Sequence, residues 1–441
     1  MSARTGCAEN GPTLRCEVPR DAVPEPPDEP VARHRTEGRQ TALVAACSHG
    51  WTDLVRRLLT EHDVDPSVGD QRALRAACRH GHASIVDMLL RDARVDPSAC
   101  AQTALREACE HGHVAIVDGL LRDRRVDPSS GGQLALGHAA RRGHVGVVAR
   151  LMCDVRVDPS ASHQRALIAA AMGGWTDVLC VLLRDARVDP SAFVQCALRW
   201  TCANGHVSAV ERLLSDARVD PSIMAQQALR LASAKGHTAV VKRLLRDVRV
   251  DPSALQQQAL RLASQNGHTA IVEHLLGDTR VDPSALEQQA LRVAAQHGHV
   301  DVVRRLLADA RVDPGAENQS ALYHACAEGH VGVVDILLVD ERIDPGANEQ
   351  QALSCACEHG HVAVVERLLR DDRVDPRAGC PTAAECAARH GHGEALACLV
   401  RDVRMGVPEV TAALVAAHDA QHAEVEAWLG RWIDLLSPRD A

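Results

Sequence analysis

The sequence predicts an all-α solenoid of about 12–13 helix-turn-helix repeats, and three observations lead to this fold class. An Asp-Pro step recurs every 31 residues without a slip. Each interval carries two runs of apolar residues at helical spacing. A glycine separates the two runs in nearly every interval. A period of this length with one supersecondary unit per repeat is typical of solenoid proteins. The prolines of the step are Pro66, Pro97, Pro128, Pro159, Pro190, Pro221, Pro252, Pro283, Pro314, Pro345 and Pro376.

The repeat that begins at Ala259 shows how the residues specify two short helices. Apolar residues within 260–263 and 271–276 lie at helical spacing. Gly267, between them, suits the left-handed residue that ends a helix. Pro283 cannot prolong the second helix, because proline lacks an N–H and disfavours helical geometry before it. Helices of about eight to ten residues are shorter than the ~12–15 at which isolated helices become marginal in water, so each repeat requires neighbours.

The repeats resemble those of the ankyrin family over roughly residues 40–430. The shared motif is A-L-x-x-A-x-x-x-G-H-x-x-V-V-x-x-L-L, as in Ala290-Leu291, Ala294, Gly298-His299, Val302-Val303 and Leu306-Leu307. The resemblance implies a concave groove that binds another protein. The family period is about 33 residues, and the two residues missing here fall between the second helix and the next first helix. We therefore expect shortened inter-repeat turns, with a tight Asp-Pro-Ser turn in place of the family's β-hairpin.

Three segments are predicted along the chain. Residues 1–39 are rich in Pro, Glu and Arg without an apolar period and are expected to be disordered. Residues 40–412 form the ankyrin-like array. Residues 413–441 are expected to be a degenerate C-terminal capping repeat with a short tail, in which Gln421 replaces the usual glycine. Terminal repeats of solenoids differ from the others because one face has no neighbour.

Composition limits the classes of function. The formal net charge of −9 argues against general affinity for phosphate backbones. Neither a secretory signal nor a stretch of ~18 apolar residues is found, so no membrane association is expected. One repeat column accepts Cys202, Ser233 and Ala295 alike, which indicates small buried side chains and free thiols. Free thiols favour a reducing compartment, so we expect an intracellular, cytoplasmic protein, with the nucleus as the alternative.

The clusters such as His297-Gly298-His299 are the candidate metal ligands, and a metal-dependent enzyme built on them is one alternative function. The second histidine of each cluster belongs to a column that also holds Trp51 and Trp175, which cannot ligate a metal. We therefore expect this imidazole to bond unpaired backbone groups at helix ends. No phosphate-loop, H-E-x-x-H or G-x-S-x-G motif is present. The sequence predicts no enzyme, no catalytic residue, no metal site and no cofactor.

Two sets of arginines repeat along the chain. One lies two residues after the opening alanine of a repeat: Arg75, Arg106, Arg199, Arg230, Arg261 and Arg292. It could form a basic stripe for an acidic ligand or nucleic acid. The alternative is that these arginines pair with Asp, Gln or turn carbonyls of the adjoining repeat. The second set lies in the turns, as at Arg249 two residues before Asp251, and its regularity indicates a structural charge ladder.

The position four residues before each opening alanine carries the candidate binding site. It holds Gly69, Cys100, Gly131, Ser162, Phe193, Met224, Leu255, Leu286, Glu317, Asn348 and Gly379. Because small and polar residues are accepted there, the position is not expected to be core. The predicted partner-binding residues are the four consecutive large ones, Phe193, Met224, Leu255 and Leu286. The alternative is that they fold inward against the first helix. The predicted function is a scaffold or adaptor that binds another protein or peptide.

Overall fold

A computed structural model of the chain describes residues 29–60, 64–379 and 381–436, and every regular element within these ranges is a helix. The helices form pairs, one pair in each repeat, which confirms the all-α solenoid.

The first helices are α1 (Glu29–His49), α3 (Val68–His80), α5 (Ala99–Glu110), α7 (Ser130–Arg142), α9 (Ala161–Gly173), α11 (Ala192–Ala203), α13 (Ile223–Lys235), α15 (Ala254–Gln265), α17 (Ala285–Gln296), α19 (Ala316–Ala327), α21 (Ala347–Glu358), α23 (Ala383–Arg389) and α25 (Val407–Asp419). The second helices are α2 (Thr52–Thr60), α4 (Ala83–Leu90), α6 (Val114–Arg122), α8 (Val145–Met152), α10 (Thr176–Leu182), α12 (Val207–Leu214), α14 (Thr238–Leu245), α16 (Thr269–Leu276), α18 (Val300–Leu307), α20 (Val331–Val339), α22 (Val362–Leu369), α24 (Gly393–Arg401) and α26 (Ala423–Leu436).

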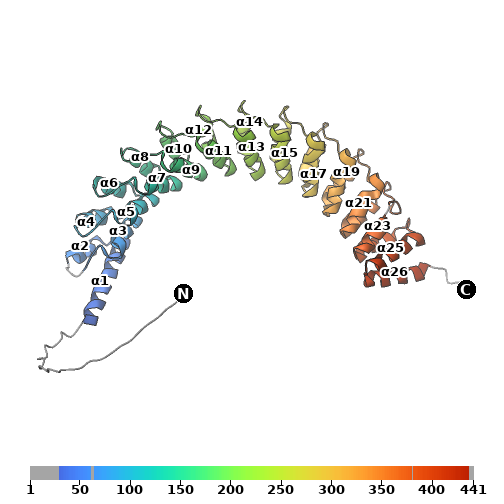
Figure 1. The fold of residues 1–441 in the computed structure, drawn as a ribbon, viewed down its shortest axis with the longest axis horizontal. Helices are drawn as coiled ribbons and strands as arrows, with labels where there is room; N and C mark the ends of the chain where they lie inside the picture. The colour runs from blue at the N-terminus through green and yellow to red at the C-terminus, as the bar shows by residue number, and fades with distance from the viewer. Residues whose placement is uncertain (1–28, 61–63, 380, 437–441) are drawn as a thin grey trace, which may run out of the picture. The chain divides into compact units, whose positions relative to one another are not determined.

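The chain divides into an N-terminal part, residues 1–96, which contains α1–α4, and a C-terminal part, residues 97–441, which contains α5–α26. Within the C-terminal part, each first helix packs against its own second helix and against the first helices of the neighbouring repeats. Figure 1 shows the first helices of this part on the inner side of a curved row and the second helices on its outer side.

Helix α1 begins earlier than the sequence analysis predicted. Residues 29–39 were expected to be disordered, but they belong to this helix; the rest of that segment, residues 1–28, lies outside the described residues. Pro30 lies in the first turn of the helix. Backbone N–H groups in this turn have no intrahelical acceptor, so the absence of an N–H in proline costs no hydrogen bond. Alanine, arginine and glutamate then continue the helix, because all three have high helix propensity. Burial of Leu43 and Ala46 anchors its C-terminal half.

Each repeat buries the same small set of apolar side chains. In the repeat of α15 and α16, Leu260, Ala263, Ile271, Val272 and Leu275 are at most 1% exposed. Full burial of a large aliphatic side chain contributes about 1.5–3 kcal/mol. The burial is shared with neighbours, because a helix as short as the eight residues of α16 cannot persist alone.

The turn that joins two repeats is held by two sets of hydrogen bonds. Asp251 Oδ1 accepts from the backbone N and the Oγ of Ser253, at 2.9 and 2.6 Å. Val250, just before this turn, is buried, and its carbonyl accepts a 2.7 Å bond from Nη1 of Arg280 in the next repeat. Nε and Nη2 of Arg280 also donate to the carboxylate of Asp278, at 2.9 and 2.6 Å. The arginine of one repeat thus clamps the turn of the repeat before it.

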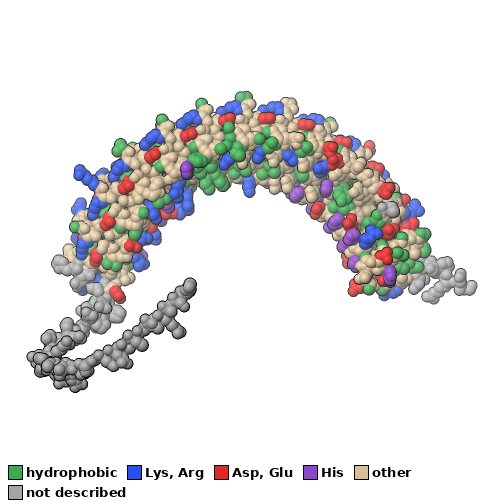
Figure 2. Space-filling view, in the orientation of Figure 1, with side chains coloured by type: hydrophobic (Ala, Val, Ile, Leu, Met, Phe, Trp, Pro, Cys, Tyr) green, Lys and Arg blue, Asp and Glu red, His purple; other side chains and the backbone are tan. Residues whose placement is uncertain are grey.

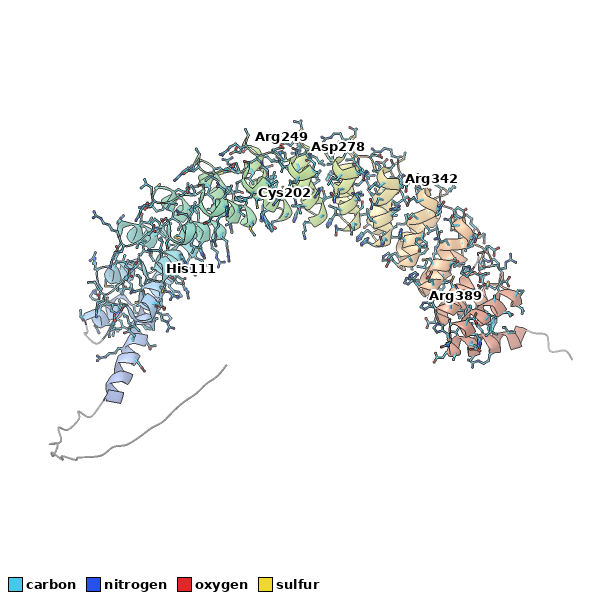
Figure 3. The ribbon with its side chains drawn as sticks, in the orientation of Figure 1. His111, Cys202, Arg249, Asp278, Arg342 and Arg389 are labelled. Atoms are coloured by element: carbon cyan, nitrogen blue, oxygen red, sulfur yellow. The ribbon has the colours of Figure 1, made fainter. Side chains whose placement is uncertain are left out.

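The observed pairing of the turn arginines differs from the predicted charge ladder in one detail. The sequence pattern predicted that each turn arginine pairs with the aspartate two residues after it, whereas in the structure Arg249 pairs with Asp247, two residues before it. The following aspartate is engaged with a serine instead, as in the bond from Ser253 to Asp251. Figure 3 shows Arg249, Asp278 and Arg342 on the outer side of the row. The regular, structural use of these arginines is confirmed.

The last repeat differs from the others in its boundary and in the residue at its helix-to-helix turn. Its first helix begins at Val407, not at Ala413. Gln421 adopts the left-handed conformation, with φ 61°, that glycine takes in the other repeats. Helix α26 has 14 residues, and on it Leu429 is fully buried while the rings of Trp428 and Trp432 stack at 6.0 Å. Its role as the cap of the array remains a prediction.

We expect removal of one whole repeat, residues 228–258, to leave a folded and shorter array, because each repeat packs only on its neighbours. The helical circular dichroism per residue should barely change. Removal of residues 228–243 alone is the matched control, since it breaks the repeat register and should lower the helical signal and the unfolding temperature. Loss of helix in both deletions would contradict the modular fold.

The clamp also predicts an acid transition. The side-chain hydrogen bond from Arg280 lowers the pKa of Asp278, and the equivalent bonds lower the pKa of Asp154, Asp247 and Asp371. A carboxyl whose pKa is lower in the folded state stabilises the fold above its unfolded pKa of about 3.9, and this stabilisation is lost as the pH falls through the folded value. We expect the thermal unfolding midpoint to fall steeply below about pH 4. A midpoint unchanged down to about pH 2 would contradict this use of the aspartates.

Candidate interaction surface

The connection that follows each Asp-Pro-Ser turn has an unusual backbone. Its last three residues before the first helix proper are left-handed; in α15 they are Leu255, Gln256 and Gln257, with φ of 51°, 55° and 64°. The same tripeptide conformation occurs in every first helix from α3 to α21. A non-glycine residue in this region costs about 1–2 kcal/mol. The third residue is a buried glutamine in most repeats, and Gln226 Nε2 lies 3.4 Å from the Arg249 carbonyl oxygen.

This backbone turns the first residue of the tripeptide toward solvent. Phe193, Met224, Leu255 and Leu286 all occupy this position and are 49%, 51%, 50% and 40% exposed. They are called the apolar stripe below. The alternative in which these side chains fold inward against the first helix is therefore wrong. The ring of Phe193 also makes an edge contact with the ring of His163, at 4.9 Å between centroids.

A second apolar row, which the sequence analysis missed, lies on the exposed side of the same four helices. It consists of Trp200, Leu231, Leu262 and Val293, three residues after the opening alanine of each repeat. Trp200 is 41% exposed, and the other three are partly exposed. The signal was available in the sequence, because the same column holds alanine, glutamate, histidine or cysteine in the other repeats. Figure 2 shows hydrophobic side chains gathered on the inner side over the middle of the C-terminal part, with Lys and Arg among them.

An arginine row, Arg199, Arg230, Arg261 and Arg292, runs along these four helices. Arg199 and Arg261 donate to the side-chain oxygens of Gln227 and Gln289 in the next repeat, at 3.0 and 2.6 Å. Arg230 donates to the carbonyl of Ala225 at 3.3 Å. Pairing with groups of the adjoining repeat, one of the two predicted alternatives, is thus confirmed for Arg199 and Arg261, whereas Arg230 bonds a carbonyl of its own repeat. Only Arg292 of this row has a carboxylate partner among the described residues, Glu317.

A cavity of about 590 Å³ opens at the N-terminal end of the apolar stripe. It lies over α9 and is lined by Arg141, Ser162, His163, Arg165, Ile168, Ala169, Met172 and Gly173. Ile168 and Met172 give it an apolar wall, while Arg141 and Arg165 place positive charge at its rim. A volume of this size accepts a large side chain of a bound segment. The sequence did not predict this cavity, because its lining combines Arg141 of α7 with residues of α9.

The histidine column is structural, as predicted. His268 Nε2 lies 3.1 Å from the carbonyl oxygen of Ala234 in the preceding repeat. Since a carbonyl only accepts, Nε2 carries the proton. Where the column holds tryptophan, Trp175 Nε1 donates in the same way to the Arg141 carbonyl, at 2.9 Å. The column therefore requires an N–H donor. Among the described residues, no group of three or more His, Cys, Asp or Glu side chains is arranged to hold a metal ion.

The glycine before this histidine is required by both backbone and packing. Gly236 has a φ of +82°, and a Cβ placed on it would lie 2.7 Å from the imidazole of His268. Any larger residue would displace the ring that bonds the preceding repeat. Glycine and histidine are thus one joint between repeats.

The cysteines of the column that also accepts serine and alanine are buried, as predicted, whereas Cys100 and Cys153, which lie outside that column, are exposed. Cys202, labelled in Figure 3, is fully buried, and burial raises its pKa. Burial also raises the pKa of Cys355 to about 11. A thiol with such a pKa is almost entirely protonated at neutral pH, so neither residue is an activated nucleophile.

Comparison with known proteins identifies the repeat. A family profile described as ankyrin repeats in three copies matches residues 25–99, 198–285 and 260–349, just over half of the chain. No curated protein matches the sequence. None of the helices in the described part of the chain combines the length and the apolar character needed to cross a bilayer.

The joint between repeats predicts the effect of removing one imidazole. His268→Ala leaves the Ala234 carbonyl without its donor and should lower the free energy of unfolding by about 1–3 kcal/mol in a urea titration. His297→Ala is the matched control, because that imidazole is exposed and should change stability by less than about 0.5 kcal/mol. Equal losses in the two variants would contradict the assignment. So would stoichiometric zinc in the purified protein that disappears with His268→Ala.

Proposed function

Because the chain belongs to the ankyrin repeat family, whose repeats generally serve as protein-binding modules, we propose that it is a scaffold or adaptor that binds a partner along the apolar stripe. Ankyrin repeat proteins are typically non-enzymatic scaffolds. The partner is another protein or a peptide segment of one, held on the exposed side of α11, α13, α15 and α17.

The observation that carries this proposal is the exposure of four large apolar side chains in consecutive repeats. In the other repeats the same position holds glycine, cysteine, serine, glutamate or asparagine, so the fold does not require a large side chain there. A contiguous apolar strip that is about half exposed tends to mark a binding surface. Neighbouring repeats lie about one helix layer apart, ~8–10 Å, so the strip is long enough for an extended or helical segment.

The stripe alone is not sufficient for a tight complex. Covering the exposed half of each side chain contributes about 1 kcal/mol, since full burial contributes about 1.5–3 kcal/mol. Four such contacts give about 4 kcal/mol, whereas a 1 μM complex requires about 8 kcal/mol. The second apolar row, the cavity over α9 and the arginine row are the remaining sources of affinity on this surface. The proposed site therefore extends beyond the four stripe residues.

We place the protein inside the cell, in the cytoplasm or nucleus. The support for this proposal is the set of free cysteines in the described residues, several of which are buried in the repeat core. Free thiols in such number are typical of a reducing compartment.

The stripe is tested by the double substitution Leu255→Ser and Leu286→Ser. We expect the affinity for peptides selected from a random peptide library on the wild-type protein to fall at least tenfold, about 1.4 kcal/mol, measured by fluorescence anisotropy. The unfolding temperature should barely change, because both side chains are exposed.

The matched control is Val155→Ser with Val248→Ser. These valines lie in outer turns and are 96% and 93% exposed, so the same loss of apolar surface should leave binding unchanged. If the stripe variant loses stability and its folded fraction still binds normally, the stripe side chains stabilise the fold instead of binding a partner, and the proposed site is wrong.

A further inference from the structure

We propose that the partner segment is an acidic amphipathic peptide whose carboxylates pair with Arg199, Arg230 and Arg261 while its apolar side chains cover the adjacent stripe. This inference rests on the proposed function and specifies the chemistry of the partner. Three observations support it: the arginine row lies beside the stripe, Arg292 and Arg199 have different partners, and charge is distributed unevenly on either side of the stripe.

The internal comparison is between Arg292 and Arg199, which occupy the same position in two repeats. Arg292 forms an ion pair with Glu317, the residue of the next repeat that stands in the stripe column. Arg199 meets Met224 in that column instead, and its Nη1 lies 3.1 Å from the methionine sulfur. Where the column is acidic, the chain supplies its own counter-ion. Where the column is apolar, the stripe column of the next repeat provides no counter-ion for the arginine.

Arg230 and Arg261 are in the same situation, because the stripe column of the next repeat holds Leu255 and Leu286. Within the described residues neither arginine has a carboxylate partner, and the Nε of each is buried without a hydrogen-bond acceptor. Burial lowers the pKa of the Arg261 guanidinium, which is the mark of a partly desolvated and uncompensated charge. A carboxylate placed here gains charge-assisted hydrogen bonds at little further desolvation cost to the arginine.

The charges beyond the stripe limit where the acidic part of the partner can lie. Toward the C-terminus the exposed side chains include Glu328, Glu349 and Glu358, which repel carboxylates, while Glu317 is already paired with Arg292. Toward the N-terminus Arg141 and Arg165 stand at the rim of the 590 Å³ cavity. Figure 2 shows more Asp, Glu and His side chains on the inner side toward α21–α25 than over the middle of this part. The acidic segment therefore spans α9 to α15, with a large apolar side chain in the cavity.

The repeat spacing sets the spacing of the partner's carboxylates. Arginines in adjacent repeats are about one helix layer, ~8–10 Å, apart. In a helical peptide about five to seven residues cover this distance, and in an extended peptide about three residues do. Nucleic acid is disfavoured by the glutamates that border the row and by the net charge of −9, and it is kept as an outcome of the test.

The test selects peptides from a random-sequence library on the immobilised full chain. We expect the recovered peptides to be enriched in Asp and Glu together with Leu, Phe or Trp. Affinity for the best peptide should fall at least tenfold with Arg230→Gln and Arg261→Gln combined, and it should fall again when the acidic residues of the peptide are replaced by Gln or Asn. Arg246→Gln is the matched control, because this exposed arginine follows the second helix α14 and should leave binding unchanged. Unfolding temperatures establish that each variant is folded.

The outcomes separate this inference from the proposed function. Peptides that lose affinity with Leu255→Ser and Leu286→Ser, but show no acidic enrichment and no loss with the arginine variant, would overturn the acidic partner and leave the proposed function standing. Absence of any peptide whose binding depends on the stripe would overturn both. Binding of a random-sequence single-stranded DNA oligonucleotide that competes with the peptides and needs the same arginines would assign the row to nucleic acid and overturn the peptide inference.

Discussion

The whole structure depends on one constraint, which is that a pair of short helices cannot bury its own apolar residues. Helix α16 has eight residues, and the side chains around Leu260 and Ile271 are covered only when repeats stack in register. Stacking in register requires that every repeat present the same surfaces at the same interval. The unbroken 31-residue period and the small side chains of the cysteine, serine and alanine column follow from this requirement.

Two joints maintain the register, and each carries a fixed hydrogen-bond geometry. On the side of the helix-to-helix turn, the imidazole of His268 bonds the Ala234 carbonyl, and Gly236 leaves room for it. On the outer side, Arg280 holds Asp278 and the carbonyl of Val250. Both joints use side-chain donors to satisfy carbonyls that the short helices and turns leave unpaired. The repeated histidines, arginines and aspartates form these joints, so they are not available for binding or catalysis.

Function is then left to the positions that the joints do not use. The left-handed connection exposes its first residue in every repeat from α3 to α21, and only four repeats place a large apolar side chain there. At the edge of this region the column turns acidic, and Glu317 neutralises Arg292. The change from carboxylate to apolar side chain both creates the stripe and leaves the neighbouring arginines without that counter-ion. Apolar surface and positive charge on this face thus have a common origin.

The sequence by itself determined the repeat, its two helices, the role of the histidine column and the solvent-exposed position of the stripe. These follow from period, helical spacing and the residue types that each column accepts, which are local properties. Only the tertiary structure decided the rest. Helix α1 begins at Glu29, although no apolar pattern in the sequence predicts a helix there. Arg249 pairs with Asp247 because the geometry of the turn brings this carboxylate to the guanidinium. The cavity over α9 and the missing counter-ion of Arg261 depend on side chains of different repeats that meet in space. The residue types at one repeat position do not show which side chains of other positions lie beside them.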